Sequence, residues 1–163
     1  MGMCEGAGSR NLRTSYTYFR RLRLRREYPD APLLGVGAVV VKDDRVLLVR
    51  RAHEPNCGRW SIPGGAVELG ETLAQAAERE VREECQVEIV MDGILSTFDL
   101  IQRDKNGNIR YHYLLIDVRA FYLSGKPTPG TDALESRWVS EPEFEELDII
   151  PRLLPVLRQV LHT

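Results

Sequence analysis

The sequence has few cysteines and no long apolar run. Its three cysteines, Cys4, Cys57 and Cys85, are widely spaced and include no CxxC pair, which argues against a disulfide framework or a zinc knuckle. The longest apolar runs, such as residues 34–41, are far shorter than the roughly 18 residues of a membrane span. The polar, arginine-bearing start of the chain lacks the apolar middle of a signal peptide. We therefore expect a soluble, cytoplasmic protein with no membrane partner.

The chain also has little net charge. Its formal net charge of -2 and pI near 6.0 give no overall basic field to hold a nucleic acid or an anionic membrane. Any polyanion must therefore be bound locally. The length of 163 residues fits one domain, and 43% hydrophobic with 28% charged residues is typical of a packed globular protein.

The N-terminal part differs in composition from the rest. Residues 1–30 form an arginine-rich extension, and residues 31–163 carry the signals of a folded domain. The arginines of the extension are Arg20, Arg21, Arg23, Arg25 and Arg26. The favoured interpretation is a solvated leader or an element packed on the domain, and the alternative is an arm that binds phosphate or a partner.

The domain reads as alternating strands and helices. Residues 35–41 and 45–49 predict a hairpin, and an extended segment at 60–63 leads into a predicted turn at Gly64 and Gly65. A helix is predicted at about 72–85, and residues 87–100 and 111–122 form a second hairpin around an Asn-Gly turn. A strand at 134–139 precedes a short helix capped by Ser140 and Glu143. Pro155 predicts that the final helix starts a turn later than its apolar pattern.

Acidic residues are concentrated on one face of the first predicted helix. Glu80, Glu83 and Glu84 are spaced three and four residues apart, so their carboxylates project from the same face and repel one another. Hard divalent cations such as Mg²⁺ take oxygen ligands of this kind. The glycines before the helix let the backbone approach a metal or phosphate closely. The pattern favours a metal-bound diphosphate as the ligand, with Mg²⁺ assisting attack by water on phosphorus.

This segment resembles the box of the Nudix hydrolases, G-x5-E-x7-R-E-U-x-E-E-x-G-U, where U is apolar. The matching positions are Gly65, Glu71, Arg79, Glu80, Val81, Glu83, Glu84 and Val87. The resemblance implies an α+β fold, an α/β/α sandwich with a mixed β-sheet between helices. It also implies Mg²⁺-dependent hydrolysis of a nucleoside diphosphate linked to another moiety, with Mn²⁺ as an alternative metal. Gln86 replaces the last glycine of the box, and we expect altered helix capping rather than lost chemistry.

The resemblance also implies residue roles. The expected metal ligands are Glu80, Glu84, the carbonyl of Gly64 and, directly or through water, Glu83. Arg79 and Glu71 are expected to organise these carboxylates. A further acid from a late loop acts as base or extra ligand in several relatives, and Asp132 and Glu135 are the two candidates here.

Residues outside the acidic face are expected to hold the substrate. Arg50 and Arg51 end a strand and point to opposite faces, so only one should reach a phosphate, and Arg51 is favoured. Gly65 allows close approach of the substrate. Tyr111 and Tyr113 share one strand face on which an adenine could stack, although sheet packing is the favoured interpretation.

The substrate stays open at this stage. The chain most resembles the ADP-ribose pyrophosphatase and MutT-like branch, which favours a sugar nucleotide such as ADP-ribose over an oxidised nucleoside triphosphate. The alternatives from other classes are a Nudix module that only binds a nucleotide metabolite and, from the basic residues 20–26, a nucleic-acid binder. Analogy with ADP-ribose-cleaving relatives suggests a homodimer.

Overall fold

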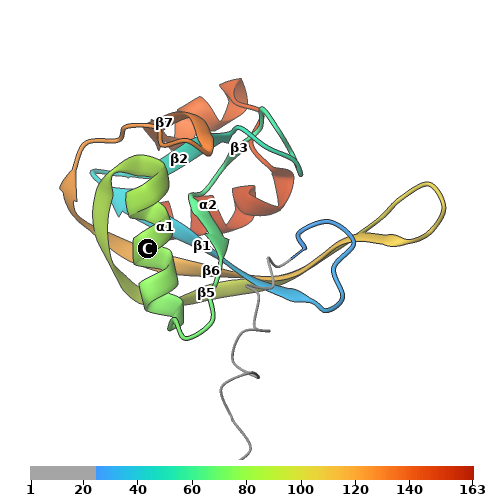
Figure 1. Cartoon of the computed structure of the whole chain (residues 1–163). Coiled ribbons are helices and arrows are strands. Elements are labelled where there is room, and N and C mark those ends of the chain that lie inside the picture. The colour runs from blue at the N-terminus through green and yellow to red at the C-terminus, as the bar shows by residue number, and fades with distance from the viewer. Residues whose placement is uncertain (1–24) are drawn as a thin grey trace, which may run out of the picture.

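The computed structural model describes residues 25–163 of the chain (Figure 1). Arg20, Arg21 and Arg23 of the predicted extension lie outside the described residues. In chain order the elements are β1 (Leu33–Lys42), β2 (Arg45–Arg51), β3 (Trp60–Ser61), β4 (Gly64–Ala66), α1 (Leu73–Cys85), β5 (Val87–Arg103), β6 (Ile109–Gly125), β7 (Ala133–Ser140), the 3₁₀ helices η2 (Glu141–Glu146) and η3 (Pro151–Leu153), and α2 (Leu154–Leu161).

All seven strands belong to one mixed sheet. Its main path runs β3-β2-β1-β6-β5, with β4 paired to β1 and β7 paired to β2. β1 and β6 are parallel, and the other strand pairs are antiparallel. β1 lies inside the sheet and is covered on both faces, which explains why its sequence is an almost continuous β-branched run rather than an alternating one. Both predicted hairpins are confirmed.

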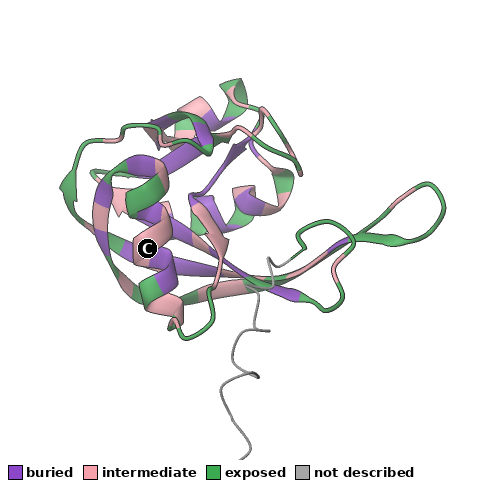
Figure 2. Cartoon of the chain, viewed as in Figure 1, coloured by how far each residue is buried: buried purple, intermediate pink, exposed green. Residues whose placement is uncertain are grey.

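Helices cover the two faces of the sheet and divide the core into two layers (Figures 1 and 2). On one face, Val81 and Cys85 of α1 pack against Val36 and Val118. On the other face, α2 and the 3₁₀ helices bury apolar side chains against β1, β2 and β7, among them Phe144, Leu153 and Leu157. The predicted α/β/α sandwich is confirmed. Among residues 25–163, no helix has the length and apolar character needed to cross a membrane.

The ends of α1 follow from local sequence. Thr72 is the N-cap and accepts a hydrogen bond from the backbone N–H of Gln75, whose side chain accepts one from Thr72 N–H in return. Gln86 is the C-cap in the left-handed conformation, with φ 57° and ψ 34°. The helix therefore ends where the box predicts, although a non-glycine residue occupies the left-handed position.

The prediction of a turn at Gly64 and Gly65 is wrong. These residues form the short strand β4, antiparallel to β1, with Gly37 opposite Gly64. A Cβ atom on Gly64 would lie 2.1 Å from the carbonyl oxygen of Val36, so the strand can approach β1 this closely only with glycine there. The turn comes later, where Glu71 N–H donates to the carbonyl of Glu68.

The expected late start of the last helix is also wrong. α2 begins at Leu154 and follows directly on η3, with Pro155 in its first turn. The first N–H groups of a helix have no partner within the helix, so a proline at this position removes no hydrogen bond.

Candidate active site

The centre of the site is formed where α1 packs against β4. Glu84 accepts a hydrogen bond from Gly64 N–H at 3.0 Å. A Cβ atom on Gly65 would lie 2.4 Å from Oε1 of Glu80, so glycine at this position makes room for the carboxylate. In a strand the N–H and C=O of one residue point to the same side. Because Gly64 N–H points to Glu84 rather than to β1, its carbonyl also points toward the carboxylates.

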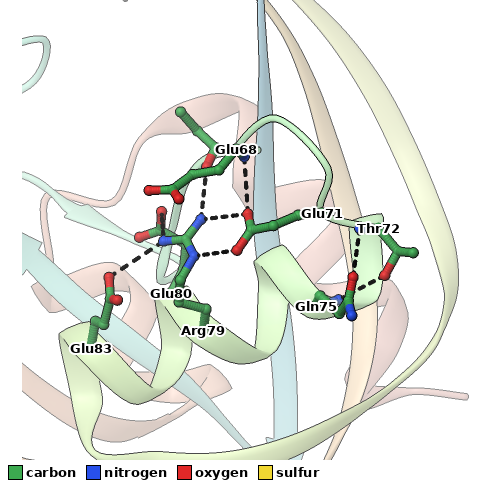
Figure 3. A network of polar contacts seen from close by, with 8 residues as sticks. Glu68, Glu71, Thr72, Gln75, Arg79, Glu80 and Glu83 are labelled. Atoms are coloured by element: carbon green, nitrogen blue, oxygen red, sulfur yellow. Dashed lines mark hydrogen bonds and ion pairs between the residues drawn. The ribbon is translucent and has the colours of Figure 1, made fainter. Parts of the chain in front are cut away.

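Arg79 connects the acidic residues of the box into one network (Figure 3). Its guanidinium donates to both oxygens of Glu71, at 2.6 and 2.9 Å, and to Glu80 at 2.7 Å. It also donates to the carbonyl of Ala66 at 3.0 Å and, more weakly, to Glu83 at 3.4 Å. These contacts connect the helix, β4 and the intervening loop to one another.

Burial makes the electrostatics of the three box carboxylates unequal. It raises the pKa of Glu84 to about 7, against the hydrogen bond from Gly64, and the charge of Glu80 raises it further. Burial also raises the pKa of Glu80, while Arg79 acts in the opposite direction. The side chain of Glu83 is 61% exposed. Two desolvated carboxylates with incomplete neutralisation therefore lie next to each other and would be stabilised by a cation.

Glu80 and Glu84 face a cavity of about 370 Å³, whose lining also includes Gly64, Gly65 and Arg51. A second cavity of about 310 Å³ adjoins the same two carboxylates and is lined by Glu83 and Asp132 as well. The structure therefore brings the expected acids Glu80, Glu83 and Glu84 to shared, solvent-accessible space.

Asp132 and Glu135, the two candidates for an additional acid of the site, lie in different surroundings. Asp132 lines both cavities, and its loop is fixed to α1 by hydrogen bonds from Thr128 N–H to Cys85 O and from Gly130 N–H to Glu84 O, both 2.9 Å long. Glu135 lies in neither lining and is 3.7 Å from Arg137. The placement of Glu135 in the site is therefore not supported.

Arg50 and Arg51 also differ in whether they line the large cavity. Arg51 lines the large cavity and donates to the carbonyl of Pro55 at 2.8 Å. Arg50 is absent from that lining and donates to the carbonyl of Gly58 at 2.9 Å. Arg50 is paired with Glu135 between β2 and β7, so both side chains point to the same face of the sheet, the face that packs against α2. The placement of Arg50 in the substrate site is therefore not supported.

The two tyrosines of β6 both line the large cavity. Tyr111 is 3% exposed and its hydroxyl donates to Glu27, whereas burial of Tyr113 is partial. Burial raises the pKa of Tyr111 to about 12, and the bond to Glu27 adds to this rise, so the hydroxyl keeps its proton at neutral pH. Of the two, Tyr113 has the more accessible ring for a ligand.

Sequence reasoning missed a polar group at the far end of the large cavity. Asp117 is 1% exposed and accepts hydrogen bonds at Oδ2 from Arg152 at 2.8 Å and from Ser96 at 3.1 Å. Its other oxygen is buried without a partner among the described residues. Arg152 also lies over the ring of Phe98, 5.1 Å from its centroid. Asp117 and Arg152 both line the cavity.

The sheet register places this group relative to the carboxylates. Asp117 is opposite Gly37 in β1, and Gly37 is opposite Gly64 in β4. Two strand spacings separate Asp117 from Gly64, or about 10 Å. The only signal in the sequence is a carboxylate between the apolar residues Ile116 and Val118, and nothing local connects it to Arg152.

The donor set suits a hard divalent cation. Glu80, Glu84 and the carbonyl of Gly64 are oxygen donors close together, and Glu83 lies at the edge of the same space. Within residues 25–163, no three His, Cys, Asp or Glu side chains are gathered into a complete metal centre. Divalent cations such as Mg²⁺ are commonly bound by one or two carboxylates together with substrate phosphates.

Comparison with known proteins agrees with this geometry. The model of the NUDIX domain matches residues 31–160. The chain belongs to the Nudix family. An ADP-ribose pyrophosphatase of Methanocaldococcus jannaschii is 31% identical to this Nudix domain over 122 residues, covering 75% of this chain and 66% of the relative. The chain thus spans just under two thirds of that relative's own length.

Two further relatives extend the comparison. A putative 8-oxo-dGTP diphosphatase 2 of Mycobacterium tuberculosis is 31% identical over 120 residues, covering 71% of this chain and 79% of the relative. The crystal structure of a NUDIX hydrolase from Nitrosomonas europaea superimposes with a TM-score of 0.66 at 27% identity, covering 80% of this chain and 73% of that one. Nudix hydrolases act on small nucleotide substrates and generally use divalent metals.

Proposed function

We propose that this Nudix domain hydrolyses the diphosphate linkage of a nucleoside diphosphate joined to another moiety, with ADP-ribose or a similar sugar nucleotide as the substrate. The observation that carries the proposal is the partly buried pair Glu80 and Glu84, fixed by Arg79 and Gly64 and facing one cavity that Arg51 also lines. Water adds to one phosphorus and the bridging oxygen leaves, which gives a nucleoside monophosphate and a phosphorylated product.

Each residue has a defined part in this proposal. Glu80, Glu84 and the Gly64 carbonyl would hold Mg²⁺ or Mn²⁺, with Glu83 as a ligand directly or through water. When bound, the metal neutralises phosphate charge and lowers the pKa of a coordinated water. Arg79 and Glu71 keep the carboxylates in position, and Arg51 binds a phosphate through charge-assisted hydrogen bonds. Asp132, next to Glu84 in the smaller cavity, is the proposed base or additional ligand.

The length of the cavity supports a substrate that extends beyond its phosphates. Asp117 and Arg152 lie about 10 Å from Gly64 by strand spacing, and their buried acceptor and cationic donor suit a nucleobase or sugar end. The accessible ring of Tyr113 offers a face for stacking. The similarity to the archaeal ADP-ribose pyrophosphatase points to the same substrate class.

One alternative substrate has a specific observation in its favour. The mycobacterial relative is named a putative 8-oxo-dGTP diphosphatase and is matched over 79% of its length. An oxidised nucleoside triphosphate is therefore the second candidate substrate. The non-enzymatic alternative is a Nudix module that binds a nucleotide without cleaving it.

A substrate panel distinguishes these functions. We would measure product release from ADP-ribose, other sugar nucleotides, 8-oxo-dGTP and unmodified nucleoside triphosphates, each with Mg²⁺, Mn²⁺ or EDTA. The proposal predicts metal-dependent release of a nucleoside monophosphate, fastest from ADP-ribose or a sugar nucleotide. Fastest cleavage of 8-oxo-dGTP would favour the second candidate. Binding without cleavage of any panel member would overturn the hydrolase proposal.

A further inference from the structure

Residues 25–28 precede the Nudix match but contact the site. Glu27 accepts hydrogen bonds from the Tyr111 hydroxyl and from Arg110, the latter at 3.1 Å. Tyr28 N–H donates to the carbonyl of Arg110 at 2.8 Å, and its hydroxyl donates to Asp104 at 3.2 Å. These bonds attach the end of the extension to the β5–β6 hairpin, the long projection in Figure 1.

This attachment places Arg26 in the lining of the large cavity. Arg26, Arg51 and Tyr113 line this same cavity. Burial raises the pKa of Tyr113, and the charges of Arg26 and Arg51 both act against this rise. The charge of Arg26 also acts on Glu80. No carboxylate within residues 25–163 forms an ion pair with Arg26, so among these residues its charge is available to a ligand.

We propose that Arg26 is a substrate-binding residue that holds the phosphate groups together with Arg51. This inference rests on the proposed function. It adds a residue from the extension to a site whose other members all lie within residues 31–160. The arginine-rich segment thus contributes at least one side chain to phosphate binding.

Charge balance explains why a second arginine is needed. A diphosphate that approaches Glu80 and Glu84 meets two partly buried carboxylates, and a bound divalent cation offsets only part of the combined negative charge. A guanidinium binds phosphate oxygens through two parallel hydrogen bonds and stays charged when partly desolvated. The bonds of Glu27 and Tyr28 hold the backbone next to Arg26 in place, which reduces the entropy lost on binding.

Arg25 provides a matched control. It is the neighbouring residue, has the same side chain and exposure class, and lies in neither cavity lining. We would compare Arg26→Gln with Arg25→Gln in the full chain. The readouts are KM and kcat for the best substrate of the panel, and the Kd of the non-hydrolysable α,β-methylene ADP in the presence of Mg²⁺.

The expected result is a rise of about 10-fold or more in both KM and Kd for Arg26→Gln, with Arg25→Gln close to the unaltered chain. Glu27→Ala should raise KM in the same direction but less, because it loosens the attachment and keeps the guanidinium. If Arg26→Gln and Arg25→Gln have equal KM and Kd values while the chain still cleaves the substrate, the inference about Arg26 is overturned and the proposed function stands. A chain that neither cleaves nor binds any nucleotide would instead overturn the proposed function.

Discussion

Arg79 connects α1, β4 and the loop between them at the scale of a single side chain. Its guanidinium donates to carboxylates from the loop and from its own helix and to the carbonyl of Ala66 in β4. Glu71 accepts hydrogen bonds from Arg79 and from Glu68 N–H, and these lower its pKa to about 2. Glu71 therefore stays ionised. A lysine has no planar fork and could not satisfy these acceptors at the same time. The fixed arginine position in the box therefore has a geometric reason.

Asp117 and Arg152 give a prediction at the scale of single residues. Arg152→Ala leaves the Asp117 carboxylate buried without its charge partner, and we expect the free energy of unfolding to fall by about 3–5 kcal/mol. Denaturant unfolding measures this change. In the double variant Arg152→Met with Asp117→Leu, most of the loss should be recovered. A loss below about 1 kcal/mol in the single variant would show that solvent already screens the pair.

The clustering of site residues was predictable from sequence where the signal was local. The spacing of Glu80, Glu83 and Glu84 and of Arg79 from Glu71 is fixed by helix geometry and the box, and the structure brings these residues together. Asp117 and Arg152 are 35 positions apart and meet only through the sheet and η3. No local periodicity reports such a contact, so the far end of the cavity was missed.

At the scale of elements, the C-cap of α1 can be tested directly. Gln86 occupies the left-handed region at φ 57°, a conformation that costs a non-glycine residue roughly 1 kcal/mol. Gln86→Gly should therefore raise the free energy of unfolding by up to about 1 kcal/mol, less the greater chain entropy of glycine when unfolded. Turnover should barely change. A large gain in rate would contradict the view that this position only caps the helix.

The cap of η2 gives a pH-dependent prediction. The hydroxyl and N–H of Ser140, together with Arg137, lower the pKa of Glu143 from 4.5 to about 2. Because the folded pKa is depressed, this stabilisation is complete above the unfolded value of 4.5 and is lost as the pH falls toward 2. The unaltered chain should therefore be more stable than Glu143→Gln at about pH 6, and this difference in unfolding free energy should decrease as the pH falls to about 3.

Denaturant curves at several pH values within this window measure the difference. Glu146→Gln serves as the control, because Glu146 is exposed on the same element and forms no ion pair among the described residues. A Glu143→Gln difference that stays constant with pH would show that the cap does not depend on the charge of Glu143.

Element types were more predictable than short strands. The helix α1, both hairpins and the capping box at Ser140 follow from periodicity and turn residues, and all are present. β4 was interpreted as a turn because two adjacent glycines normally mark one. Here the glycines instead let a strand lie against β1 and the Glu80 carboxylate, a tertiary requirement that the local sequence does not show.

At the scale of the whole molecule, the fold follows from the sequence and the assembly does not. The sandwich was predicted from the resemblance to the Nudix family and is confirmed by the two core layers on either side of the sheet. The homodimer, the cytoplasmic location and the boundary at residue 30 stay predictions. β5 is an edge strand with exposed apolar side chains such as Val90 and Ile94, which is a place to look for a second copy.

The central claim is that Glu84 helps to bind a divalent cation that hydrolysis requires. Glu84→Gln keeps an acceptor for Gly64 N–H but removes a charged oxygen ligand and its repulsion of Glu80. The chain should therefore remain folded and be equally or slightly more stable. Glu146→Gln, exposed and distant from the cavities, is again the control.

The most direct measurement is the turnover of the best panel substrate against Mg²⁺ concentration for the unaltered chain, Glu84→Gln and Glu146→Gln. The account predicts no turnover in EDTA and a fall of about 100-fold or more in kcat for Glu84→Gln at saturating Mg²⁺, with Glu146→Gln unchanged. Turnover of Glu84→Gln equal to that of the unaltered chain at saturating Mg²⁺ would contradict the metal-binding role of this carboxylate.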